Sequence, residues 1–295
     1  MRFLPFCLLT LICTSCYKSK PEPVDSNAFL SPTALGKLTH KKLSEVSGIA
    51  ASVQNPGALW TVNDSNNPAE VYLVDENLNI KLTCKLGVKN RDWEDIEVGP
   101  GPVEGKHYVY VGDIGDNNGR HEYKYIYRFE EPVVEDGKKE ITIRRFETFV
   151  VRLADAKKDT ETLMVHPKTK NVYLVSKREQ PVVVYELKAP LRIRDTLTAV
   201  PVTSLPLKQI VGGSISPDGN EVLLKNYDNI YYWNIEGMPL VEGLKARPQI
   251  LPYVEEPQGE SIAFNRDASG FYTLSEKIKG EDTYLYFYAR SPAQQ

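Results

Sequence analysis

The sequence predicts an all-β protein, a β-propeller of four-stranded blades, and three observations support this prediction. Short segments rich in Val, Ile, Tyr and Phe alternate with turn signals such as Asn55-Pro56-Gly57, which is typical of antiparallel strands. The segments recur in the same order in five successive units. No stretch of the chain has a convincing helical pattern. Radial repetition of four-stranded units is how a propeller is built, so five blades are expected. Six is the alternative, because the second and third units are widely spaced.

The first three strands of each unit can be placed by their shared pattern. The first strands are expected at residues 46–50, 93–97, 160–164, 212–216 and 259–263. The second strands are expected at 59–64, 108–113, 172–177, 222–227 and 271–276. The third strands are expected to begin at residues 70, 123, 182, 230 and 283.

A fourth strand can be placed in all units except the last. These strands are expected at residues 80–86, 141–153, 198–205 and 249–254. Residues 29–41 lie before the first unit and can supply the missing strand to the last one. The amino-terminal strand would then close the ring and remove the free sheet edges that promote aggregation.

The amino terminus has the features of a bacterial lipoprotein signal peptide over residues 1–16. Arg2 is followed by a short apolar run at residues 3–12, too short to span a bilayer, and then by Cys13-Thr14-Ser15-Cys16. Small residues before a cysteine resemble the lipobox, so Cys16 is the expected lipidation site. Residues 17–28 are polar and form the expected tether, and residues 29–295 form the propeller domain. We therefore expect a lipid-anchored protein of the bacterial cell envelope, with secretion or a periplasmic location as the alternative.

Composition narrows the range of partners. The net charge of −3 shows no basic excess, which argues against nucleic acid. Membrane contact is expected through the lipid anchor only. Cys84 is the one cysteine expected in the propeller domain, where it is most simply a buried strand residue. We expect a monomer that binds a small-molecule or envelope ligand.

The repeats predict an acidic site, because equivalent positions of propeller blades lie around one channel. Two residues before the central Ile or Leu of the first strands stand Ser47, Glu94, Glu161, Gly213 and Glu260. The second strands end at Asp64, Asp113, Lys177, Asn226 and Glu276. An acidic residue before a strand can also be an ordinary turn former or a solvated charge.

Carboxylates crowded around one axis repel one another, which raises their pKa values or requires a cation. Lys177 and Lys277 can supply part of the positive charge, and a hard divalent ion, Ca²⁺, is the expected cofactor. The candidate metal ligands are Asp64, Glu94, Asp113, Glu161, Asn226, Glu260 and Glu276. The candidate catalytic residues are Glu94, Glu161 and Glu260. The candidate pocket residues are Trp93, Asp95, Asp116, Asn117, Lys177 and Lys277.

Four motifs carry a resemblance to a known family. They are LWTVNDS at residues 59–65, DWEDI at 92–96, YVGDIGDN at 110–117 and PQGESI at 257–262. Together they resemble a group of exported bacterial β-propeller proteins of unassigned activity. More distantly, the chain is similar to esterase-like phytases and to gluconolactonase-type propellers. The resemblance implies the propeller fold, and the last group implies a metal in the channel.

Three functions remain open from the sequence. One is a metal-dependent hydrolase of an ester, lactone or phosphoester. The second is a non-catalytic propeller that binds a ligand or protein of the cell envelope. The third is a structural propeller whose ion only ties the blades together.

Overall fold

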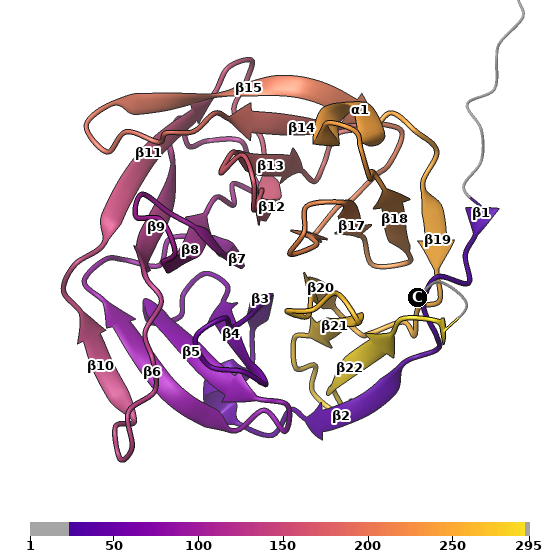
Figure 1. Ribbon diagram of the computed structural model, residues 1–295. Helices are drawn as coiled ribbons and strands as arrows, with labels where there is room; N and C mark the ends of the chain where they lie inside the picture. The colour runs from indigo at the N-terminus through magenta and orange to yellow at the C-terminus, as the bar shows by residue number, and fades with distance from the viewer. Residues whose placement is uncertain (1–23, 293–295) are drawn as a thin grey trace, which may run out of the picture.

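A ring of β-sheets surrounds a central axis in the computed structural model, which describes residues 24–292 (Figure 1). The predicted all-β propeller fold is confirmed. Helical structure in the described part is limited to a 3₁₀ turn, η1 (Lys41–Leu43), and a short helix, α1 (Leu240–Gly243). No described helix has the length and apolar character that a bilayer span requires. The expected signal peptide and Cys16 lie outside the described residues.

The strands follow one another from the axis outward in each unit. The first unit contains β3 (Val46–Ala51), β4 (Ala58–Asn63), β5 (Glu70–Asp75) and β6 (Ile80–Leu86). The second contains β7 (Trp93–Pro100), β8 (His107–Asp113), β9 (Lys124–Glu130) and β11 (Glu147–Leu153). The third contains β12 (Thr160–Val165), β13 (Val172–Ser176), β14 (Val182–Leu187) and β15 (Thr196–Leu205). The fourth contains β16 (Gly212–Ile215), β17 (Glu221–Lys225), β18 (Ile230–Asn234) and β19 (Gln249–Leu251). The last contains β20 (Gly259–Phe264), β21 (Gly270–Ser275), β22 (Tyr284–Ala289) and β2 (Thr33–Lys37).

The amino-terminal strand closes the ring as the sequence predicts. β2 pairs antiparallel with β22, the last strand of the chain (Figure 1). Closure protects the outer edge of β22 and joins the two ends of the propeller domain in one sheet. Phe29 strengthens this junction by packing edge-on against Tyr232 and Phe271, at centroid distances of 5.7 and 4.9 Å.

The single fourth strand expected at residues 141–153 is wrong, because two strands occupy this stretch. β11 pairs with β9 in the second unit, but β10 (Glu140–Ile143) crosses to the first unit and pairs in parallel with β6. Ile141 and Ile143 alternate with exposed residues and pack on the apolar cluster between these two units, which favours the crossing. β11 also pairs in parallel with β15, which joins the second and third units into one sheet. β1 (Val24–Asp25) pairs in parallel with β19.

The hydrophobic core lies between neighbouring units instead of at the axis. Five buried clusters fill the spaces between successive sheets, and each draws its side chains from two adjacent units. The fully buried Trp60 and Trp93, for example, belong to the cluster between the first and second units. Because both faces of the inner strands are covered, strands such as β5 and β13 are buried along most of their length.

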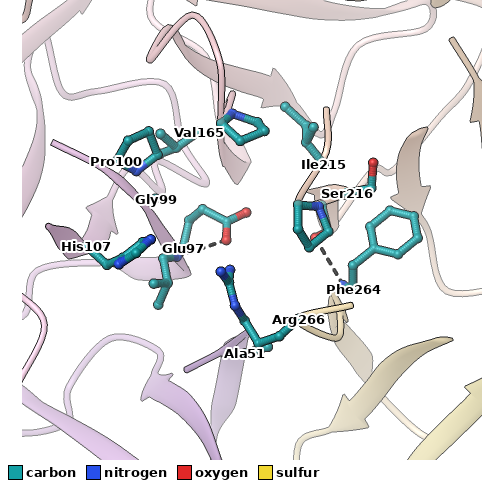
Figure 2. Close-up of a pocket in the computed structure, with 14 residues that line it drawn as sticks. Ala51, Glu97, Gly99, Pro100, His107, Val165, Ile215, Ser216, Phe264 and Arg266 are labelled. Carbon is teal, nitrogen blue, oxygen red and sulfur yellow. Dashed lines mark hydrogen bonds between the residues drawn. The ribbon is translucent and has the colours of Figure 1, made fainter. Parts of the chain in front are cut away.

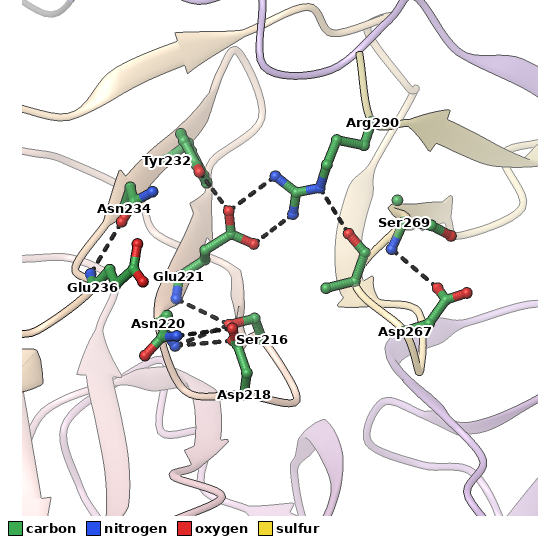
Figure 3. Close-up of polar contacts among 12 residues, drawn as sticks. Ser216, Asp218, Asn220, Glu221, Tyr232, Asn234, Glu236, Asp267, Ser269 and Arg290 are labelled. Atoms are coloured by element: carbon green, nitrogen blue, oxygen red, sulfur yellow. Dashed lines mark hydrogen bonds and ion pairs between the residues drawn. The ribbon is translucent and has the colours of Figure 1, made fainter. Parts of the chain in front are cut away.

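A polar cluster ties the last unit to the fourth one (Figure 3). Arg290 donates from Nη1 to Glu221 Oε1 at 3.0 Å and pairs from Nη2 with Oε2 at 2.5 Å. Tyr232 donates to the same carboxylate at 2.6 Å, and the Arg290 guanidinium lies 4.8 Å from the centre of the Phe29 ring. The two side chains of the ion pair are 14% and 10% exposed, so water would compensate poorly for its loss.

Replacing Arg290 with Met should therefore lower the free energy of unfolding by about 3 kcal/mol, because the Glu221 carboxylate would remain buried without its cation. Urea unfolding followed by circular dichroism measures this change. Lys37→Met is the matched control, because Lys37 pairs with Asp282 at a largely exposed site and its loss should leave the midpoint nearly unchanged. Equal midpoints for the two variants would contradict the assigned role of Arg290.

Candidate metal centre at one mouth of the channel

β-Bulges in the innermost strands set the geometry of the site. In β7, Trp93 pairs with Asp113 and Asp95 pairs with Gly112, which leaves Glu94 without an opposite residue. Glu161 in β12 and Glu260 in β20 occupy the same unpaired place. A bulge turns the extra side chain out of the regular alternation. Three glutamates from three units are thereby directed toward one region.

Glu94 is shared by two groups of three carboxylates. Oxygen atoms of Asp64, Asp92 and Glu94 lie within 4.8 Å of one another, and so do oxygen atoms of Glu94, Asp159 and Glu161. We call these the open triad and the buried triad. Asp64 and Asp92 are half-buried, whereas all three members of the buried triad are buried. Each group is able to hold a metal ion through oxygen ligands.

Glu260 lies next to the buried triad and has a different set of partners. Lys177 Nζ is 3.1 Å from Glu161 Oε1 and 3.8 Å from Glu260 Oε1. Tyr227 donates a hydrogen bond to Glu260 Oε1 at 2.6 Å. Lys177 also lies over the Tyr227 ring, 5.6 Å from its centre. One ammonium therefore balances part of the negative charge of two glutamates.

Burial and mutual repulsion raise the pKa values of these carboxyl groups. Burial raises the pKa of Glu94 well above its ordinary value, and the charges of Glu161 and Asp64 raise it further. Burial raises the pKa of Glu161 to about 8, although the Lys177 ammonium opposes the shift. Burial, with the charges of Asp64 and Asp159, raises the pKa of Asp92 to about 6. The cluster carries more negative charge than its protein partners offset, which a cation would relieve.

The loop after β8 fits closely against the triads. A Cβ atom at position 115 would overlap carboxylate oxygens of Glu94 and Asp92, so any other residue there requires these two side chains to move. The preceding carbonyl, of Ile114, accepts hydrogen bonds from the buried Lys124 ammonium and from Thr160 Oγ1. These bonds fix the loop that carries Gly115 against the start of β12.

The structure separates three other expected ligands from the triads. Asp113 lies 3.3 Å from Arg91 Nε and accepts a 3.3 Å hydrogen bond from Tyr127. Asn226 uses its side-chain oxygen for the backbone amides of Asp228 and Asn229, in a turn. Glu276 belongs to neither triad, but it is close enough for burial and then the charge of Glu260 to raise its pKa to about 8.

The expected pocket residues lie in different environments, from the core to the exposed surface. Trp93 is fully buried against Tyr127 in the core and does not line the mouth. Asp95 accepts from the backbone amides of Leu163 and Ile96, each at 2.8 Å. Asp116 caps the turn at Arg120 and His121. The exposed residues are Asn117, which contacts Arg178, and Lys277.

Two members of the triads were not among the candidate ligands predicted from the sequence. Asp92 and Asp159 each stand two residues before a bulge glutamate, in Asp92-Trp93-Glu94 and Asp159-Thr160-Glu161. Asp159 accepts from the Asp116 amide at 2.8 Å and pairs with Arg178 Nε at 2.8 Å. The repeated Asp-x-Glu pattern is the signal that would have identified both.

Comparisons with known proteins establish the fold and leave the chemistry open. No family model matches the chain, and no curated protein matches it. The PQQ-bound form of aldose sugar dehydrogenase from Streptomyces coelicolor is a similar solved structure, with a TM-score of 0.50 and 11% identity over 88% of this chain and 98% of that one. The Dos1 propeller has a TM-score of 0.40 and 14% identity over 83% and 68%. At 11% identity the first likeness supports the fold alone, and the chain is a β-propeller protein with an acidic centre.

Replacing Gly115 with Ala should lower the free energy of unfolding by about 1–3 kcal/mol, because the added methyl group displaces Glu94 and Asp92 from packed positions. Urea denaturation measures the change. Gly87→Ala is the matched control, since a Cβ there meets no atom within 4 Å and should alter stability by less than about 1 kcal/mol. If both variants unfold at the same urea concentration, the close approach at Gly115 is not a constraint.

Proposed function

We propose that the protein is a Ca²⁺-dependent hydrolase that acts on an ester, lactone or phosphoester at the acidic mouth of the channel. The observation that carries this proposal is the open triad, in which half-buried Asp64 and Asp92 meet the buried, shared Glu94. The three carboxylates would bind a cation from one side. Its other side would remain open to solvent or substrate. A catalytic ion needs such an open position.

The donor set favours calcium. Both triads contain only carboxylates, and no His or Cys side chain takes part in either. Hard oxygen ligands suit Ca²⁺ and Mg²⁺ and disfavour zinc or copper. Calcium accepts several protein carboxylates in flexible geometry, whereas magnesium keeps most of its water. Several carboxylates from separate strands and loops therefore fit calcium better.

Glu260 is the group best placed to handle a proton. It belongs to neither triad and faces Lys177 and Tyr227. Hydrolysis adds water across the scissile bond, and a carboxylate in this position can accept the proton that the attacking water loses. Lys177 remains protonated, because the carboxylates of Glu161 and Glu260 outweigh the burial that would lower its pKa. A bound Ca²⁺ would supply polarisation of the bond under attack.

Non-catalytic ligand binding is the second candidate, and the position of Lys177 favours it. The ammonium pairs with Glu161 and also approaches Glu260, so Glu260 is already partly neutralised. A cation in the buried triad instead of the open one would be enclosed by protein oxygens, as in a structural site. The acidic mouth would then serve as a binding platform.

Adding Ca²⁺ to the mature chain after chelation should raise its melting temperature, with about 2.7 kcal/mol of stabilisation at a hundred times the dissociation constant. Glu94→Gln should abolish most of this rise, because Glu94 belongs to both triads. Glu260→Gln should keep the rise but reduce Ca²⁺-dependent hydrolysis by about a hundredfold or more. Differential scanning calorimetry and a panel of chromogenic esters, lactones and phosphoesters measure the two effects.

Glu104→Gln, at an exposed loop residue, is the control that should change neither property. A melting temperature that does not respond to Ca²⁺ would refute the cation site. A clear response without hydrolysis of any substrate in the panel would instead select the non-catalytic candidate.

We also propose that the mature protein is anchored to a membrane of the bacterial envelope through lipid on Cys16. The support is the sequence pattern of residues 1–16. Cys16→Ser should move the protein from the membrane fraction to the soluble fraction, because the propeller would lose its only expected anchor. Immunoblots of fractionated cells measure the distribution, and the same membrane share for both proteins would refute lipidation.

A further inference from the structure

A polar cavity lies near the axis of the ring, away from the two triads, and Figure 2 shows residues that line it. Its volume is about 220 Å³, and residues at or just beyond the ends of all five innermost strands line it. The metal centre is built from the beginnings of these strands. Glu97 of β7 lines the cavity three residues after Glu94, roughly 10 Å farther along the strand. The two sites are therefore distinct.

Glu97 and Arg266 are the charged groups of this cavity. Glu97 Oε1 accepts a hydrogen bond from the Val98 amide at 2.9 Å. Within residues 24–292, neither side chain forms a hydrogen bond or ion pair with another side chain, although Arg266 is directed toward Glu97 in Figure 2. The guanidinium also feels the charge of the buried Glu131 carboxylate, but its N–H groups and one oxygen of Glu97 remain available for hydrogen bonds to a ligand.

The surroundings add a third open polar group and an apolar wall. His107 lines the cavity, and its Nδ1 is buried without a hydrogen-bond partner. Val165, Ile215 and Phe264 contribute apolar surface. Burial raises the pKa of Glu97 to about 8, and the Val98 amide and the charge of Arg266 oppose this shift.

These features restrict the ligand. A simple anion would lie unfavourably close to the Glu97 carboxylate, and a simple cation would be repelled by Arg266. A ligand that satisfies both residues therefore needs an acidic group and a hydrogen-bond donor together. The cavity is smaller than the roughly 300–1,000 Å³ of pockets that bind drug-sized molecules. A planar guanidinium fork matches a carboxylate through paired hydrogen bonds.

We propose that this cavity binds a small α-substituted carboxylic acid, with its carboxylate on Arg266 and its adjacent ammonium or hydroxyl group on Glu97. Val165, Ile215 and Phe264 contact the aliphatic part of the ligand. The site is independent of the proposed hydrolase activity, because it shares no residue with the two triads.

Isothermal titration of the mature chain tests the proposal with four probes, L-valine, 2-hydroxyisovalerate, isovalerate and isobutylamine. At least one of the first two should bind, and the last two, which lack one polar group, should bind at least about tenfold more weakly. Stronger binding of L-valine identifies an amino acid site, and stronger binding of the hydroxy acid identifies a hydroxy acid site. No binding by either α-substituted acid up to about 10 mM, or equal binding of all four, would overturn the proposal.

Arg266→Gln and Glu97→Gln should each weaken the binding of the preferred probe by at least about tenfold, because each replaces one polar group that contacts the ligand. Arg192→Gln and Glu104→Gln are matched controls at exposed positions outside the cavity. Arg266 is itself exposed, so its variants test the site even where Glu97→Gln fails to fold. Binding that survives Arg266→Gln unchanged would also overturn the proposal.

Discussion

Packing of each sheet between two neighbours is the constraint on which this structure depends. Five apolar clusters lie between successive units, and both faces of the inner strands are covered by them. Every unit needs a partner on each side, so the ring must close, and β2 closes it by pairing with β22. Large apolar residues are used in these layers, as Trp93 illustrates. Charged side chains gather near the axis, and both proposed sites lie there.

The innermost strands also need hydrogen-bond partners at the edges that face the axis. Side chains of neighbouring units supply several of them. Ser47 Oγ donates to the Trp93 carbonyl at 2.9 Å, and Asp95 accepts from the Leu163 amide at 2.8 Å. Polar residues near the axis therefore have two different roles. Asp95 bonds to backbone and holds the ring together, whereas Glu94, next to it in the bulge, remains for the triads.

The sequence predicted the fold because its repeats record the strand order directly, and it placed Glu94, Glu161 and Glu260 in equivalent positions for the same reason. The sequence alone did not show that Trp93 packs in the core while Glu94 joins the triads. The directions of these two side chains depend on the bulge, which forms only when β7 pairs with β8. The split of residues 141–153 was also hidden, since β10 pairs with a distant unit. Contacts between a loop and a strand of the same unit, such as Gly115 against Glu94, leave no periodic signal.

The buried carboxyl groups of the acidic centre destabilise the folded chain when they are ionised. For Glu161 the ordinary pKa of 4.5 rises to about 8 on burial, so between these pH values the folded chain retains a proton that the unfolded chain releases. Stability contributed by this group is therefore present below about pH 4.5 and decreases as the pH rises toward 8. The proposed cation would reverse this balance, because it would bind the ionised carboxylates of the folded state and not the dispersed carboxylates of the unfolded chain. This cost grows through neutral pH and is complete only above about pH 8. The apolar layers between the sheets already stabilise the ring, so the fold does not require the acidic centre.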